Sequence, residues 1–369
     1  MSKFLKKKKF IVSILLILSF FSLSAVISTN YYSEPSYVRD NTGYYEKYGP
    51  KIGLTEKSKI HREFSGGYAG DAIHYIMIAM DREDLSNTPY TYRILVPKLA
   101  GFFAKPFVDI KSKNCEDNLF KKISFIWRGI NIVSCFLLIL IPLIHFKKYI
   151  FSKTQNFEFP LILLMNIFNM GVIMTAPFSL VDIPTYVIIT LGASFFFSKN
   201  LKLLTLTTCI GIFVKEITMI LMLPILFLAI LNYKKKLFLS ILSLAAPILI
   251  FLILRISISG EASDLGQLKY SFKDPLNFYY LKVHIYNAGL LNFFARVFFS
   301  IGIIFSIFVL YRFWYKKFYW EFLIITILTL SVIILNLFLA SAVIRVTQVV
   351  TPFLIFYILE SIRSKDLKV

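Results

Sequence analysis

The sequence predicts an all-α polytopic membrane protein with about ten transmembrane helices. Of its 369 residues, 57% are hydrophobic and the mean hydropathy is +0.69, which exceeds what a soluble domain of this size carries. Apolar runs of about 18 residues or more, enough to cross a bilayer, recur along the chain. Lysine and arginine gather in the short segments between these runs, a pattern typical of cytoplasmic loops.

The first expected element is a span at residues 10–27. Lys6 to Lys9 precede it and predict a cytoplasmic N-terminus. The run resembles the apolar region of a signal peptide, but it is long enough to span and no clear cleavage site follows. We therefore expect an uncleaved signal anchor. Residues 28–122 then form a large first extracytoplasmic loop.

The remaining spans follow from the alternation of apolar runs and basic segments. They are expected at about residues 123–146, 159–176, 183–197, 237–254, 297–311, 320–340 and 346–362, with a helical hairpin at 203–232. A second extracytoplasmic loop covers 255–290. The count places both termini of this multi-pass membrane protein in the cytoplasm, with residues 1–369 forming one membrane domain.

The hairpin at 203–232 is the most unusual element. Lysines flank it at both ends, and one helix cannot start and finish on the same side of a membrane. The chain must therefore turn back, and Lys215 and Glu216 lie near the turn. Each arm is shorter than the roughly 20 residues of a full span. We expect the turn to lie below the outer surface, in a cavity lined by protein.

Two segments of the first loop predict helices. In the first, glycines give way at Asp71 to a helical apolar pattern over residues 71–80, which places Asp71, His74 and Tyr75 on one face. Asp71 could instead be an N-cap, and His74 could have a purely structural role. Residues 92–103 predict an interfacial helix with Arg93 and Lys98 at its polar edge, where both could simply contact headgroups.

Nearly every ionisable residue that interrupts or edges the apolar runs maps to the outer face, opposite the lysine-rich ends. These residues are Asp182, Lys215, Glu216, Arg255, Arg296 and Arg345. A charge in the membrane core costs roughly 2.5–3.5 kcal/mol, so such residues are usually functional. This gathering predicts a polar site on that face. Structural alternatives remain open, namely a helix cap for Asp182, a mutual ion pair of Lys215 with Glu216, and snorkelling arginines near the span ends.

Several short motifs resemble those of the GT-C integral membrane glycosyltransferases. They are Asp71 with Tyr75, Tyr92-Arg93-Ile94-Leu95-Val96-Pro97, Lys215-Glu216-Ile217-Thr218 followed by Leu223-Pro224, and Arg345 with Pro352. The resemblance implies about ten spans, a large first outer loop with an essential acidic residue and membrane-parallel helices, and a polyprenyl-phosphate-linked sugar donor. Many members carry the acidic residue soon after the first span, often as a pair. Here Asp71 lies far downstream, so Asp40 is a rival candidate.

The expected function is inverting sugar transfer from a lipid-phosphate-linked donor to a glycan, lipid or protein acceptor of the cell envelope. Asp71 is the expected general base. The expected substrate-binding residues are His74, Tyr75, Arg93, Asp182, Lys215, Glu216, Arg296 and Arg345. The cations among them would neutralise the leaving phosphate. Asp182 would align the acceptor or help to hold a divalent cation, and the metal requirement stays open.

Functions of other classes are alternatives to sugar transfer. A transporter or flippase for a charged lipid or glycan predicts ionisable groups through the whole depth of the bundle, whereas here they lie on one side. A glycan polymerase or ligase, or a non-catalytic scaffold, would also fit a membrane class. No nucleic-acid partner is expected despite the net charge of +20, because the basic residues form no contiguous solvated patch. The three cysteines, Cys115, Cys135 and Cys209, show no metal spacing or disulfide framework.

Overall fold

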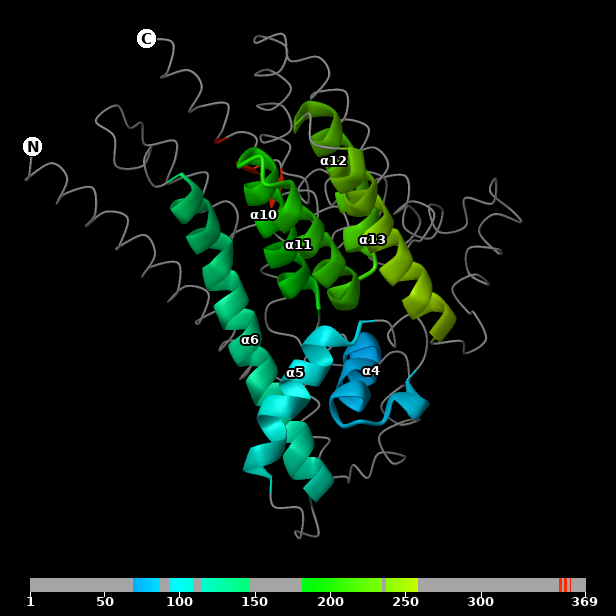
Figure 1. Cartoon of the computed structure of the whole chain (residues 1–369). Helices are drawn as coiled ribbons and strands as arrows, with labels where there is room; N and C mark the ends of the chain where they lie inside the picture. Colours follow the sequence, from blue (N-terminus) through cyan, green and yellow to red (C-terminus); the bar gives the residue numbers. More distant parts are fainter. Residues whose placement is uncertain are drawn as a thin grey trace, which may run out of the picture.

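The computed structural model describes residues 69–86, 93–108, 115–146, 181–233 and 237–257, with five further positions between 352 and 359 (Figure 1). Within these residues the chain is helical and contains no strand. The predicted spans at 10–27, 159–176, 297–311 and 320–340 lie outside the described residues. So do most of the span at 346–362 and nearly all of the second loop.

The described elements follow one another in the order α4, η4, α5, η6, α6, α10, α11, α12 and α13. Their bounds are Ala69–Ala79, Glu83–Leu85, Leu95–Ala104, Lys105–Phe107, Cys115–His145, Asp182–Phe197, Leu201–Val214, Ile217–Tyr233 and Leu237–Ser257. The helices predicted at 71–80, 123–146, 183–197 and 237–254 are confirmed as helices. The hairpin predicted at 203–232 is confirmed as two helices, α11 and α12.

Two helices are long and apolar enough to cross a membrane, judged by length and composition over the described residues. They are Asn118–His145 within α6 and Leu237–Ile256 within α13. Helices α10, α11 and α12 are apolar but shorter. Helix α6 begins at Cys115, so the end of the predicted first loop is already helical. The count of ten spans remains a prediction.

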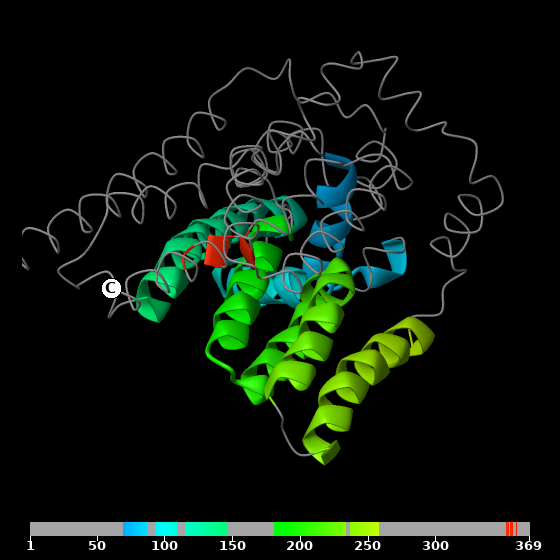
Figure 2. The same cartoon turned by 90° about the horizontal axis from the view of Figure 1, so that it is seen from above.

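Helices α10, α11 and α12 pack against one another, α6 runs along α10, and α13 lies against α11 and α12 (Figures 1 and 2). Gly211 allows α11 to pack closely against α10 and α12. A Cβ atom at this position would overlap the Thr218 side chain of α12 and lie 2.8 Å from Cγ2 of Ile188 in α10. The three helices therefore meet tightly near the turn between α11 and α12.

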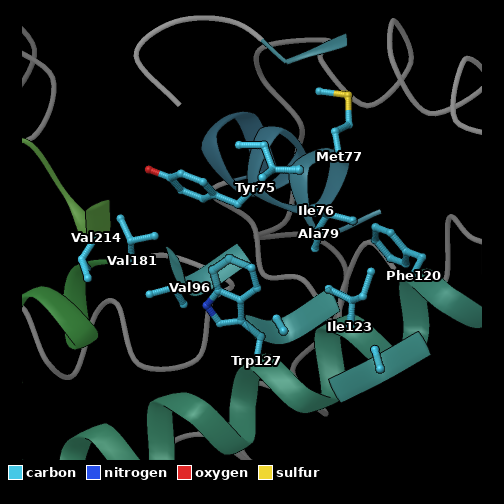
Figure 3. Close-up of a cluster of buried hydrophobic side chains, with 13 residues drawn as sticks. Tyr75, Ile76, Met77, Ala79, Val96, Phe120, Ile123, Trp127, Val181 and Val214 are labelled. Carbon is cyan, nitrogen blue, oxygen red and sulfur yellow. The ribbon is translucent and has the colours of Figure 1, made fainter. Parts of the chain in front are cut away.

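Helices α4 and α5 form a second unit on the N-terminal half of α6 (Figure 1). Its core is apolar and includes Tyr75 of α4 and Trp127 of α6, whose ring centroids are 6.1 Å apart (Figure 3). Val181 and Val214 belong to the same core, so it reaches the start of α10 and the end of α11. This shared core places the first-loop helices beside the α11–α12 turn.

Helix α5 has two different faces. Val96, Ala100 and Ala104 are buried, whereas Phe102 is 70% exposed and Phe103 50% exposed. The sequence predicts an interfacial helix at 92–103. A helix forms at Leu95–Ala104, and its interfacial position stays a prediction. The expectation that Arg93 lies at its polar edge is wrong. Arg93 precedes the helix and is 8% exposed, because its guanidinium is bound by partners inside the protein.

Candidate functional site

The candidate site is built on the two-residue break between α11 and α12. Lys215 has an extended backbone with φ −162° and ψ 132°, and its N–H donates to the Gly211 carbonyl at 2.9 Å. Thr218 N–H donates back to the Lys215 carbonyl at 3.0 Å, which starts α12. Successive side chains of an extended backbone point in opposite directions. Lys215 and Glu216 consequently reach different partners.

Lys215 forms a buried ion pair with Asp182. Its Nζ donates to Oδ1 of Asp182 at 2.8 Å, and the two side chains are 7% and 1% exposed. Val181 is the N-cap of α10 and Asp182 is the first helical residue, so the alternative of Asp182 as the cap is wrong. A carboxylate in the first turn is favoured by the helix dipole. The pair ties the break to the start of α10.

Glu216 binds Arg93 through two hydrogen bonds. Nε of Arg93 donates to Oε2 at 2.7 Å, and Nη2 donates to Oε1. Nη1 of Arg93 donates to the hydroxyl of Tyr75 at 2.6 Å. The alternative of a mutual Lys215–Glu216 pair is therefore wrong, and so is that of Arg93 as a headgroup contact. A guanidinium that binds a carboxylate in this way forms a strong, directional ion pair, because each of two N–H donors faces one of the two oxygens.

Five of the residues selected from the sequence thus lie together, and they come from separate parts of the chain. Tyr75 comes from α4, Arg93 from the segment before α5, Asp182 from α10, and Lys215 with Glu216 from the break. We call these five the ion-pair cluster. Two cations and two carboxylates give it a formal charge of zero. In Figure 3 the Tyr75 hydroxyl points toward the segment that carries Val181 and Val214.

Of the other residues selected from the sequence, some lie in described helices and the rest lie outside the described residues. His74 is fully buried in α4, and Asp71 is the third residue of that helix. Asp71 is therefore not the N-cap. Arg296, Arg345 and the rival Asp40 lie outside the described residues. Arg255, near the end of α13, lies over the ring of Phe251 at 5.2 Å from its centroid.

A second group of ion pairs, between α4 and α5, was not predicted from the sequence. Lys98 Nζ donates to Oδ1 of Asp81 at 2.9 Å and also pairs with Glu83, while Lys105 pairs with Asp81. Asp81 has a φ of 61°, a left-handed conformation that Asp tolerates better than most residues. The hydrogen bonds from Lys105 and Lys98 hold the pKa of Asp81 below its ordinary value. The group fastens α4 to α5, and the acidic run after α4 was its sequence signal.

A polar contact at the other end of α10 was also missed. Nδ1 of His145, at the end of α6, lies 2.9 Å from Oγ of Ser194. Both residues line a cavity of about 420 Å³ whose other walls are mostly apolar. Single polar residues in apolar runs give no sequence signal for such a contact, because it depends on how two distant helices pack.

The sequence leaves open whether Asp182 helps to hold a divalent cation. In the structure Lys215 Nζ donates to the Asp182 carboxylate. No group of three or more His, Cys, Asp or Glu side chains that could hold a metal ion occurs among the described residues.

Over the part of the chain that the structure describes, the fold and the site define a class: a helical protein with two helices apolar and long enough to cross a membrane, and with an ion-pair cluster where its helices meet. Comparisons with protein-family models, with curated proteins and with solved structures find no match to this chain. The proposals below therefore rest on the residues themselves and on the short motifs of the sequence.

Proposed function

We propose that this protein is a membrane glycosyltransferase that moves a sugar, with inversion, from a lipid-phosphate-linked donor to an acceptor at the extracytoplasmic face. One observation carries the proposal. Ionisable side chains from four separate segments, distant in sequence, converge at the break between two apolar helices. Burying such groups is costly, and strongly coupled groups of this kind are characteristic of functional sites.

The membrane location is supported by the surface of α13. Its exposed large apolar residues include Leu237, Phe238, Ile241, Leu249, Ile253 and Ile256, each more than half exposed. An apolar surface of this kind is unfavourable in water and favourable in lipid. We propose the ten-span topology with both termini in the cytoplasm of a bacterial inner membrane. In that topology the ion-pair cluster lies on the extracytoplasmic side.

The cations of the cluster suit a phosphate leaving group. Arg93 keeps its charge in an apolar environment and presents a fork that matches two phosphate oxygens. Lys215 supplies a second charge from the neighbouring break. We propose that both neutralise the charge that develops on the leaving lipid phosphate, together with Arg296 and Arg345. Stabilising developing charge in a site without bulk water is the most effective contribution that such groups make.

Asp71 is proposed as the general base. It lies four residues before Tyr75 in α4, one helical turn from the residue that contacts Arg93. In the proposed step the acceptor hydroxyl gives its proton to the Asp71 carboxylate, and its oxygen bonds to the anomeric carbon. The bond from that carbon to the phosphate oxygen breaks, and its electron pair leaves with the lipid phosphate. Attack opposite the leaving group inverts the anomeric centre.

The test is sugar transfer by the purified full-length chain from labelled polyprenyl-phosphate sugars to a panel of glycan, lipid and protein acceptors. Asp71→Asn keeps the side-chain shape but cannot accept the proton, so transfer should fall about 100-fold or more. Asp84→Asn is the matched control, since Asp84 is an exposed acid of the same loop. Undiminished transfer by Asp71→Asn would remove the base assignment. Absence of transfer from every donor by the wild-type chain would remove the proposed function.

The runner-up function is a transporter or flippase for a charged lipid or glycan. The break between α11 and α12 favours it, because discontinuous helices form the substrate sites of many transporters. Vesicles containing the protein distinguish the two functions. A transporter moves a labelled lipid or glycan across the bilayer without chemical change, whereas a transferase leaves the sugar covalently attached to an acceptor.

A further inference from the structure

We propose that the Glu216 carboxylate occupies the anion-binding position of Arg93 in the resting protein, and that an incoming phosphate ester displaces it. The inference rests on the proposed function in taking a lipid phosphate as the ligand. It assigns Glu216 a role opposite to that of a substrate ligand, namely that of an internal competitor. The argument depends on the geometry of the two ion pairs in the cluster.

The first step concerns what Arg93 offers. Two of its nitrogens, Nε and Nη2, face the two carboxylate oxygens of Glu216. A phosphate ester presents two oxygens in the same way, so it can replace the carboxylate on the same edge of the guanidinium. Carboxylate and phosphate therefore compete for one position, and they cannot both occupy it.

The second step concerns what holds Arg93 in place during the exchange. Its third donor, Nη1, is bound to the Tyr75 hydroxyl at 2.6 Å. Tyr75 is fully buried and packs against Trp127 in the core of the α4–α5 unit. Arg93 thus keeps its orientation when Glu216 leaves, and the fork stays directed at the vacated position.

The third step concerns why Glu216 exchanges and Asp182 does not. Glu216 lies in the break between two helices and its side chain is 20% exposed, which gives the displaced carboxylate a route to water. Asp182 is 1% exposed in the first turn of α10, and its partner Lys215 is 7% exposed. Freeing a carboxylate that is nearly enclosed is far more costly than freeing one that can be hydrated.

The experiment measures binding rather than turnover. The full-length protein in neutral detergent is titrated with farnesyl phosphate, and in a second arm with inorganic phosphate, by isothermal calorimetry. Glu216→Gln removes the competing charge and should tighten farnesyl phosphate binding about tenfold, equivalent to about 1.4 kcal/mol. Glu216→Asp keeps the charge but is too short for the same two-point contact, so it should also bind more tightly. This second variant preserves the test if the first does not fold.

Three further variants show whether the effect belongs to this position. Arg93→Lys, which lacks the fork, should bind about tenfold more weakly. Glu83→Gln makes the same chemical change in the exposed pair with Lys98, and its affinity should equal that of the wild type. Asp182→Asn removes the other carboxylate of the cluster without freeing the fork of Arg93, so any gain in affinity should be clearly smaller than that of Glu216→Gln. If the Glu216 variants also bind inorganic phosphate more tightly than the wild type does, the phosphate group is what the site recognises. A tightening confined to farnesyl phosphate would show that the lipid chain contributes.

The outcomes separate this inference from the proposed function. Unchanged or weaker binding in both Glu216 variants overturns the inference, as does an equal gain in Asp182→Asn or no binding by any variant. Tighter binding in the Glu216 variants supports it, even if the wild-type chain transfers no sugar, in which case the proposed function alone fails. If the wild type transfers sugar but the Glu216 variants bind farnesyl phosphate no more tightly, the proposed function stands and the role of Glu216 as an internal competitor is overturned.

Discussion

Arg93 and Glu216 stand 123 positions apart in the sequence and form a two-point ion pair, with Nε of Arg93 2.7 Å from Oε2 of Glu216. The pair joins two parts of the molecule. Arg93 belongs to the unit of α4 and α5 that packs on α6, and Glu216 lies in the break of the helical hairpin. The position of the first-loop helices over the hairpin turn therefore depends on a polar contact as well as on the shared apolar core.

The first prediction concerns the energetic coupling of this pair. Glu216→Ala should lower the free energy of unfolding by about 3 kcal/mol, because it leaves the buried charge of Arg93 without its main partner. Arg93→Ala should lower it by less, about 1–2 kcal/mol, because the Glu216 side chain is 20% exposed and its freed carboxylate can be hydrated. The double variant should lose less than the sum, with a coupling of about 1–3 kcal/mol. Denaturant unfolding of the four proteins in detergent measures the cycle. Additive losses would show that the two side chains do not stabilise each other.

The second prediction concerns the more deeply buried pair. Lys215→Met leaves the Asp182 carboxylate, which is 1% exposed, without the ammonium beside it. The expected loss of unfolding free energy is about 3–5 kcal/mol. Adding Asp182→Asn should recover part of the loss, since the buried charge that has lost its ammonium neighbour is then gone. Thermal unfolding in detergent checks both variants, and a double variant less stable than Lys215→Met would contradict the reasoning.

The third prediction concerns the crossing of α4 and α5. A Cβ atom at Gly101 would overlap the backbone carbonyl of Ala79, and backbone cannot move aside as a flexible side chain can. Gly101→Ala should therefore destabilise the protein by about 1–3 kcal/mol. Gly129→Ala is the matched control, because a Cβ there has open space and alanine favours a helix. That variant should be neutral or more stable by up to about 1 kcal/mol, and equal losses in the two variants would refute the packing argument.

The fourth prediction concerns acid sensitivity of the α4–α5 connection. Lys105 and Lys98 lower the pKa of Asp81 in the folded protein. These ion pairs therefore stabilise the folded protein at pH values above about 3.9, the ordinary pKa of Asp, and the stabilisation is lost as the pH falls through the lowered pKa. Exposure of the side chains keeps the effect small. Amide hydrogen exchange in α4 and α5, corrected for intrinsic rates, should become faster as the pH is lowered from about 5 to the lowest value that the protein tolerates. Asp81→Asn should remove that dependence, and a wild-type-like response would assign it to another group.

The sequence indicated the helices well because apolar run length and flanking lysines are local properties. The break at Lys215 and Glu216 followed from a run with lysines at both ends, which one helix cannot satisfy. The structure places α11 and α12 on either side of those residues. The apolar run predicts a helix from about residue 123, whereas α6 begins at Cys115. The difference of about two helical turns arises because the residues from Cys115 onward are largely polar and lie outside the apolar run.

Local sequence also supplied the members of the ion-pair cluster, because charged residues beside apolar runs are conspicuous. It could not supply their partners. Lys215 and Glu216, adjacent in sequence, were open to a mutual pair, yet the extended backbone at the break turns them toward Asp182 and Arg93. Ion pairing acts over a few ångströms, and which charges come that close depends on how helices distant in sequence pack together. The tertiary structure decided that Arg93 is buried, that Tyr75 holds it, and that both carboxylates are bound by cations.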